Sequence, residues 1–210
     1  NHEGLREGVP IFRDVFDLSG YQTAAIGPLD YAYGKHSIRD RVGSWTRSAC
    51  VLRPTSRTPL PQVVKDGACD QRDWQLVDKA VDFLRDAAAE EKPFMLYLTT
   101  GLVHPAFVAD QEHMDRVDAE SIEIPPTLGS VDGTGHPVDE YIRVTKNCDK
   151  EFSRETVRLI RHVYFAMIAA LDDMIGRVLQ EVDALDLRDS TYIIFSSDHG
   201  EMAGEQNQIL

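Results

Sequence analysis

Short apolar runs alternate with stretches of helical periodicity, and this alternation constrains the fold more than any other feature of the sequence. Residues 21–27 (YQTAAIG), 94–100 (FMLYLTT) and 190–196 (STYIIFS) have the length of strands. The last two are nearly continuous apolar runs, which is typical of strands covered on both faces. Strands joined by long helical connections pair in parallel through right-handed crossovers. The sequence therefore predicts an α/β fold with a mainly parallel sheet flanked by helices.

Three helices are expected between and before these strands. Residues 10–18 end at Ser19–Gly20, a usual helix stop, and residues 70–91 carry apolar side chains at three- and four-residue spacing. On that second helix Asp73 and Arg85 are expected to face outward. Ser153 is expected to cap the longest helix, whose apolar face runs from Val157 to Leu185. Residues 28–69 are expected to be a long irregular segment and residues 101–152 a second, loop-rich segment, and such segments are usually functional inside a compact domain.

Bulk composition narrows the classes of partner. A chain of 210 residues with 42% hydrophobic content can bury one core, and no apolar run is long enough to span a membrane. A formal charge of -13 argues against a nucleic-acid partner. None of Cys50, Cys69 and Cys148 forms a C-x-x-C pair, so a zinc ribbon is not supported. A Cys50–Cys69 bridge and three free thiols both remain open.

The most chemical-looking motif follows the third apolar run. Ligands gather at the carboxyl ends of strands in parallel sheets, and Asp198–His199–Gly200 stand there. A carboxylate and an imidazole side by side can reach one cation. Aspartate supplies the hard oxygen that calcium or magnesium prefers, whereas histidine is more typical of zinc. An ordinary strand-to-loop turn, with the aspartate as a helix cap, is the alternative.

Two further clusters follow the other apolar runs. His104 comes shortly after residues 94–100, where an imidazole can hold an anionic ester or protonate a leaving alcohol. Lys35 and His36 come after residues 21–27 and offer positive charge to a sulfate or phosphate oxygen. A plain loop residue and a solvated surface turn are the respective alternatives. His113, His136 and His162 receive no role.

An ordered set of segments resembles the sulfatases of the alkaline-phosphatase-like superfamily. S-D-H-G-E after a long helix with L-D-D-M-I-G-R-V-L is similar to the family's metal-binding segment, and V-H-P to its substrate-binding histidine segment. The set continues through G-Y-Q-T-A-A-I-G-P-L-D-Y, G-K-H-S-I-R-D-R-V-G-S-W-T-R, D-W-Q-L-V-D-K-A-V, H-P-V-D-E-Y and V-T-K-N-C. It implies that residues 1–210 are an internal part of the family's N-terminal catalytic domain, with sequence expected on both sides.

The resemblance implies a chemistry as well as a fold. Sulfatases hydrolyse sulfuric esters with calcium and a formylglycine made from the cysteine of C-x-P-x-R. By position, Asp198 and His199 would be calcium ligands, and His104 would contact the sulfate. His36 would be a second contact to the sulfate or to the leaving group, and the side chain of Lys35 would supply positive charge. The members that the ordered set resembles most imply a sulfated sugar substrate, the 2-sulfoglucuronate of glycosaminoglycans, and a lysosomal or secreted location.

Three departures from the family pattern keep alternatives open. C-x-P-x-R is absent, so the formylglycine is expected upstream and residues 1–210 alone are expected to be inactive. Pro28 follows Gly27 where the family has lysine, and Gln206 follows Glu205 where such members have histidine. A non-catalytic sulfatase-like protein that binds sulfated sugar is one alternative. A zinc phosphodiesterase of the same superfamily is the other, distinguished by two zinc ions in place of one calcium.

Overall fold

The structure is a computed structural model that describes residues 10–27, 61–65, 71–90, 92–129, 136–138, 140 and 151–209. Several predictions fall outside these ranges. They concern Lys35, His36, Pro28 and the three cysteines. The chain divides into two compact units. The first unit combines residues 1–44, 70–101 and 172–195, and the second combines residues 45–69, 102–171 and 196–210.

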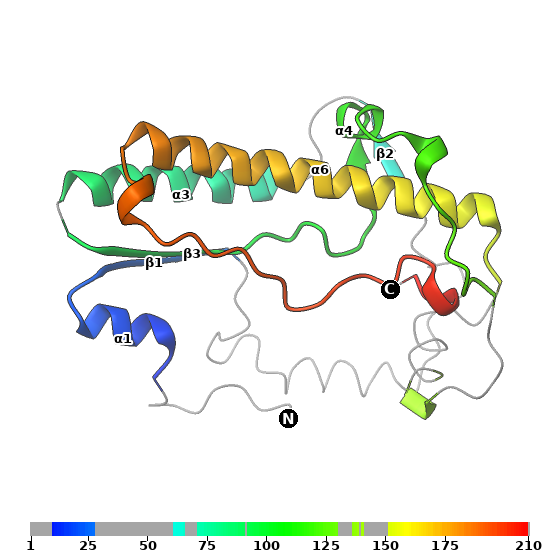
Figure 1. Cartoon of the computed structure of the whole chain (residues 1–210), viewed down its shortest axis with the longest axis horizontal. Helices are drawn as coiled ribbons and strands as arrows, with labels where there is room; N and C mark the ends of the chain where they lie inside the picture. The colour runs from blue at the N-terminus through cyan, green and yellow to red at the C-terminus, as the bar shows by residue number, and fades with distance from the viewer. Residues whose placement is uncertain are drawn as a thin grey trace. The chain divides into compact units, whose positions relative to one another are not determined.

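The first unit contains the predicted parallel pair of strands. Its first elements are α1 (Phe12–Leu18), β1 (Gln22–Ile26), α3 (Gln71–Ala89) and β3 (Phe94–Leu98). β1 and β3 pair in parallel from Gln22↔Phe94 to Ile26↔Leu98, and lie side by side in Figure 1. α1 contacts β1, and α3 contacts both strands. The sequence-based prediction of an α/β fold with parallel strands and flanking helices is confirmed.

Gly27 lets the chain leave β1 close to the residue that follows β3. Its φ is +109°, a region that L side chains rarely adopt, and a Cβ there would lie 2.0 Å from the Thr99 carbonyl oxygen. The Thr99 N–H continues the strand pairing by donating to the Ile26 carbonyl at 2.9 Å. The two strand ends are therefore held together by backbone contact, and only glycine fits there.

The burial pattern of α3 follows the predicted stripe with one correction. Buried apolar residues recur at helical spacing, namely Val77, Ala80, Val81, Leu84 and Ala87. Asp73 was expected to face outward, but it is 1% exposed. Its Oδ2 accepts a hydrogen bond from the Gly101 N–H at 2.7 Å. A buried carboxylate is tolerated when hydrogen bonds satisfy it, and apolar periodicity does not reveal such partners.

The third predicted strand is not formed. Residues 191–197 are not part of a strand, and Tyr192 and Ile194 are 98% and 87% exposed. The prediction for residues 190–196 was therefore wrong as a description of this structure. An apolar run indicates what a segment would bury, whereas a strand also needs a neighbour to bond its backbone N–H and C=O groups. Among the residues that the structure describes, none takes that place.

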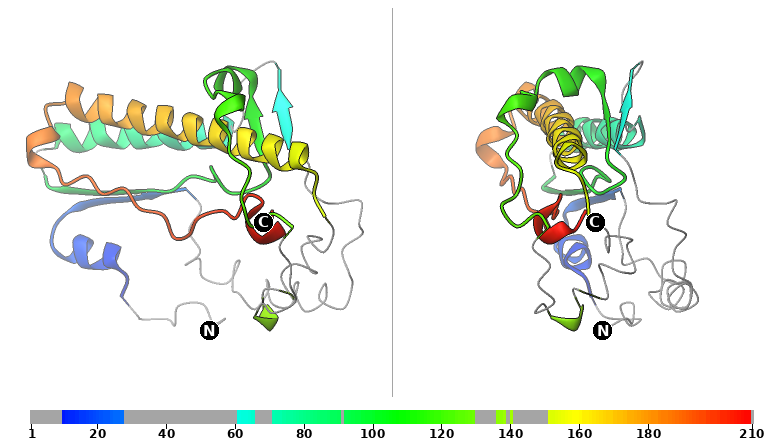
Figure 2. Two further views of the ribbon diagram at one scale, coloured as in Figure 1. Left: turned by 45° about the vertical axis from the view of Figure 1, so that its right-hand side comes forward. Right: turned by 90° about the vertical axis from the view of Figure 1, so that its right-hand side faces the viewer.

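The second unit holds a small parallel sheet that the sequence did not predict. β2 (Gln62–Val64) pairs in parallel with β4 (Val108–Asp110), and both contact α4 (Gln111–Asp115), as Figure 2 shows. Asp110 caps α4 through the His113 N–H, and its Oδ1 also lies 2.6 Å from His113 Nδ1. The expectation that residues 28–69 are irregular was wrong at β2, and neither β2 nor β4 was predicted, because strands of three residues leave almost no periodic signal.

The longest helix is α6 (Arg154–Ala184), whose first half belongs to the second unit. The predicted cap is confirmed, since Ser153 Oγ accepts from the Thr156 N–H at 3.1 Å. Several residues of the predicted apolar face are buried: Val157, Ile160, Met167, Met174 and Val182. Short one-turn helices complete the described elements: η2 (Ala119–Ser121), η3 (Arg188–Ser190) and η4 (Glu205–Asn207). In the part of the chain that the structure describes, no helix is long and apolar enough to cross a membrane.

Candidate functional site

Asp198 and His199 are held by short-range hydrogen bonds in an exposed stretch of chain. Asp198 Oδ1 accepts from the His199 N–H at 3.0 Å, and His199 Nδ1 lies 2.8 Å from the Gly200 carbonyl oxygen. The second carboxylate oxygen, Asp198 Oδ2, lies 3.7 Å from His199 Nε2. The side chains are 89% and 66% exposed. Both groups are therefore fixed relative to each other and open to solvent.

The bond to Gly200 decides which nitrogen of His199 can bind a cation. A carbonyl oxygen only accepts, so Nδ1 must carry the hydrogen, and the neutral ring then has its lone pair on Nε2. The pKa of His199 is raised, first by this bond and then by the charge of Asp198. A proton therefore competes with a cation for Nε2. With a cation bound, Nε2 and Asp198 Oδ2 can face the same ion.

This pair fits part of a cation site. Calcium takes six to eight oxygen ligands and zinc usually takes four ligands. Within the described ranges, no group of three or more His, Cys, Asp and Glu side chains could hold a metal ion. The Asp198 carboxylate suits calcium, and one neutral imidazole is compatible with it. The pair therefore supplies two donors, and further ligands must come from other residues.

His104 has the same ring arrangement as His199. Its side chain is exposed, and its Nδ1 is hydrogen-bonded to the Pro105 carbonyl oxygen. Because Nδ1 must donate to that carbonyl, Nε2 is the ring atom available to a ligand. The segment that leads to His104 starts at Gly101, whose N–H donates to the buried Asp73 carboxylate. The chemistry expected of His104 is thus available at Nε2.

That His104, the Asp198–His199 pair and the Lys35–His36 pair meet at one site stays a prediction. In the described part of the chain, no hydrogen bond or ion pair joins His104 to Asp198 or His199. Lys35 and His36 lie outside the described residues. The expected meeting of the three segments at one edge is therefore neither confirmed nor contradicted.

The segment after His199 is anchored within the second unit. Thr127 Oγ1 donates to Glu205 Oε2 and accepts from the Gln206 N–H, the latter at 3.1 Å. Gly204 has φ +98°, and a Cβ there would lie 2.5 Å from Val157 Cγ1 of α6. The Gln206 side chain, which stands where related members have histidine, is exposed. Tertiary contacts thus fix the backbone on one side of the Asp198–His199 pair.

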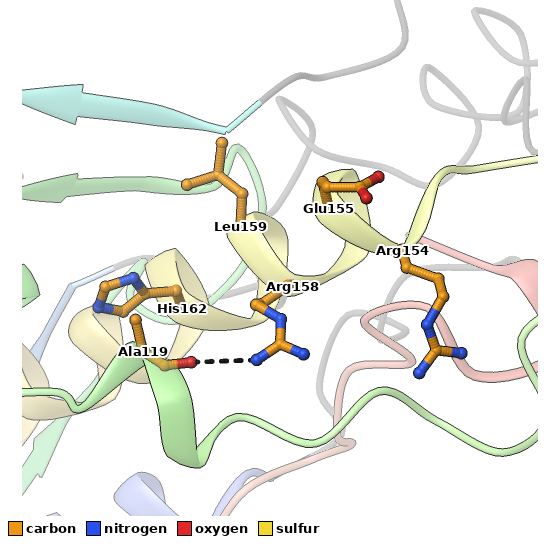
Figure 3. Close-up of a pocket in the computed structure, with 6 residues that line it drawn as sticks. All are labelled: Ala119, Arg154, Glu155, Arg158, Leu159 and His162. Atoms are coloured by element: carbon orange, nitrogen blue, oxygen red, sulfur yellow. Dashed lines mark hydrogen bonds between the residues drawn. The ribbon is translucent and has the colours of Figure 1, made fainter.

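Sequence reasoning missed a group of basic residues on α6. Arg154, Arg158 and His162 are spaced four residues apart and line a cavity together with Ala119 (Figure 3). Residues at this spacing lie on one face of a helix. The four-residue spacing just after the predicted cap at Ser153 was the signal that could have found them.

Comparison with known proteins assigns the chain to a family. The sulfatase family matches residues 1–210. Arylsulfatase K of Homo sapiens is 36% identical over 99% of this chain and 42% of its own length, and that of Rattus norvegicus is 36% identical over 99% and 39%. Arylsulfatase K of Danio rerio is 33% identical over 99% and 43%. The chain spans about two-fifths of the length of these relatives. The protein therefore belongs to the sulfatase family.

Proposed function

We propose that these residues form part of the catalytic domain of a calcium-dependent sulfatase that hydrolyses sulfate esters of sugars. The observation that carries the proposal is the placement of Asp198 Oδ2 and His199 Nε2, 3.7 Å apart, within a match to the sulfatase family over residues 1–210. A hard carboxylate oxygen and an imidazole lone pair, both exposed to solvent, are suited to share one cation. The family match supports a divalent metal ion and a sulfate ester substrate, and the hard oxygen of Asp198 favours calcium as the ion.

Each predicted residue has a distinct task in this proposal. Asp198 and His199 would hold the calcium ion, which when bound would polarise the sulfate group as a Lewis acid. His104 would hold a sulfate oxygen or protonate the leaving alcohol through Nε2, since Nδ1 is engaged with Pro105. Lys35 and His36 would add positive charge at the sulfate oxygens.

Substrate, nucleophile and location extend the proposal beyond the described residues. C-x-P-x-R is absent from the 210 residues, and the relatives are more than twice as long as their matched part. We therefore propose that a formylglycine outside these residues is the nucleophile. The names of the relatives support an arylsulfatase-type activity. The proposed substrate is the 2-sulfoglucuronate of a glycosaminoglycan, and the proposed location is lysosomal or secreted.

The test is made on the complete protein with a matched pair of variants. Asp198→Ala removes the exposed carboxylate of the pair, and Asp189→Ala removes an exposed carboxylate from η3, nine residues earlier in the chain. Sulfate release from a sulfated glucuronate is measured together with bound calcium by elemental analysis. Asp198→Ala is expected to lower turnover by about a hundredfold or more and to release calcium, whereas Asp189→Ala is expected to change neither.

Three results would contradict the proposal. Two zinc ions per molecule, with phosphodiester cleavage, would favour the zinc phosphodiesterase. Binding of sulfated sugar without any sulfate release would favour a non-catalytic sulfatase-like protein. Equal loss of calcium and turnover in Asp198→Ala and Asp189→Ala would show that neither carboxylate acts at a specific site.

A further inference from the structure

A cavity of about 350 Å³ lies beside the first turns of α6 in the second unit. Its lining comes from α6 and from the one-turn helix η2 (Figure 3). The lining residues are Ala119, Arg154, Glu155, Arg158, Leu159 and His162. The cavity is open to solvent, and Arg154, Glu155 and Leu159 of its lining are exposed. None of the lining residues is among those assigned to calcium or to the sulfate ester above.

The basic residues form one row in this cavity. Arg154, Arg158 and His162 follow each other at four-residue spacing, so they lie on one face of α6. Figure 3 shows the guanidinium groups of Arg154 and Arg158 extending to the same side of the helix. α6 begins at Arg154, and the amino-terminal end of a helix carries partial positive charge. The row of basic residues and the amino-terminal end of the helix thus both favour a negatively charged ligand.

Two of the three basic side chains are partly fixed by backbone carbonyls. Arg158 Nη1 donates to the Ala119 carbonyl at 3.5 Å, which uses one of the several N–H donors of its guanidinium. His162 Nε2 lies 3.0 Å from the Met114 carbonyl and 3.1 Å from the Val117 carbonyl, so it donates to both. These bonds hold the wall of the cavity in place. Ordered guanidinium groups bind tetrahedral oxyanions through paired N–H donors.

We propose that this cavity binds a sulfate group carried by an oligosaccharide, through the guanidinium groups of Arg154 and Arg158. The sulfated sugar as carrier rests on the proposed function, whereas the preference for an oxyanion rests on the cavity itself. The whole chain has a formal charge of -13 and repels polyanions at long range. A local basic cavity would therefore allow a sulfated chain to bind beyond the one sulfate that is hydrolysed.

Glu155 is the one acidic residue of the lining, and its removal tests whether the cavity binds a negatively charged ligand. Its carboxylate lies on another side of the helix from the two guanidinium groups in Figure 3. The pKa of Glu155 is lowered, first by a hydrogen bond to its own backbone and then by one to Ser153, so the carboxylate is ionised at neutral pH. Removing this negative charge should strengthen the binding of an anion, whereas removing either arginine should weaken it.

The experiment measures binding of a labelled, fully sulfated oligosaccharide to the complete protein by fluorescence anisotropy. All proteins carry Asp198→Ala, so that substrate turnover does not interfere. The variants are Arg154→Gln with Arg158→Gln, Glu155→Gln, and Arg72→Gln as the control. Arg72 is an exposed residue of α3 and does not line the cavity. Melting temperatures verify folding, and Arg154→Gln alone is used if the double variant fails to fold.

The expected result is a loss of affinity of about tenfold or more in the double arginine variant, with a shallower dependence of affinity on salt. Glu155→Gln should bind more tightly, and Arg72→Gln should bind as before. The same oligosaccharide without sulfate should not bind. The proposal would be overturned if the double arginine variant lost no more affinity than Arg72→Gln, or if Glu155→Gln bound more weakly. It would also be overturned if inorganic sulfate, at the concentration of the oligosaccharide, displaced the oligosaccharide completely.

Turnover of a small aryl sulfate separates this proposal from the proposed function. With Asp198 intact, the double arginine variant should hydrolyse the small ester at an unchanged rate, because the proposal assigns the two arginines to a second sulfate that such an ester lacks. Loss of that turnover would overturn the assignment of the cavity to a separate sulfate. Absence of turnover in the unmodified protein would refute the proposed function alone, since the binding measurements do not depend on hydrolysis.

Discussion

Arg85 of α3 and Glu181 of α6 form a two-bonded ion pair between helices that are far apart in the sequence. Arg85 Nε donates to Glu181 Oε1 at 2.7 Å, and Nη2 donates to Oε2 at 3.0 Å. Arg177 Nη1 adds a third bond to Oε2 at 3.1 Å. The Glu181 side chain is only 10% exposed. Hydrogen bonds from Arg85 and then Arg177 lower the pKa of this carboxyl group.

Glu181→Gln is expected to lower the melting temperature at neutral pH by about 2–4 °C. The pKa of Glu181 is lower in the folded than in the unfolded chain. The ionised carboxylate therefore stabilises the fold above the unfolded pKa, and this contribution is lost as the pH falls through the folded pKa. Melting curves of the complete protein across the acidic range should show the two proteins converging. Asp82→Asn is the control, because Asp82 lies 3.6 Å from Arg85 and is 73% exposed. A difference in melting temperature between the unmodified protein and Glu181→Gln that increases in acid would contradict the expectation.

Gly27→Ala is expected to destabilise the protein by about 3 kcal/mol, because the added Cβ meets the Thr99 carbonyl oxygen and φ is positive. Gly176→Ala is the matched substitution on α6, where a Cβ would meet nothing within 4 Å. It should stabilise the protein by about 0.5–1 kcal/mol, since alanine is the better helix former. Denaturant unfolding measures both. If both variants changed the free energy of unfolding in the same direction, the contact at Gly27 would not be decisive.

His104→Gln is expected to lower the rate of sulfate ester hydrolysis by about 10²–10⁴-fold, because glutamine cannot transfer a proton at neutral pH. His136→Gln is the control, since His136 is also an exposed histidine and makes a bond within its own turn to the Val138 N–H. The measurement is turnover by the complete protein, with the pH profile recorded for each variant. Equal rates for the two variants would remove His104 from the proposed site.

Asp73→Ala is expected to cost about 1–3 kcal/mol, because the Gly101 N–H loses its carboxylate acceptor. Asp73→Asn should cost less, since its amide oxygen can still accept. Hydrogen exchange at the Gly101 amide, followed by mass spectrometry, reports the loss locally. Faster exchange in Asp73→Ala than in Asp73→Asn is the expected order. Unchanged exchange in both variants would show that Asp73 does not fix the start of the segment that carries His104.

The long elements were predictable because each carries its own periodic signal. The apolar stripe of α6 repeats over many turns and Ser153 caps it, so both follow from side-chain spacing. β1 and β3 were predictable from short apolar runs joined by a helical connection. Some hydrogen bonds join neighbours in the sequence, as between His199 Nδ1 and the Gly200 carbonyl. The chemistry of the Asp198–His199 pair was predicted for the same reason, because the two residues are adjacent.

Other features depend on partners that no sequence window contains. The sequence determined the helices, the parallel pair of strands and the residue types of the candidate cation site. The tertiary structure decided that Asp73 is buried, because its partner Gly101 comes from another segment. It also decided that residues 191–197 form no strand with any described residue and that Arg154, Arg158 and His162 share a cavity with Ala119. Periodicity encodes which side chains avoid water, whereas hydrogen-bond partners and cavities arise only when distant segments meet.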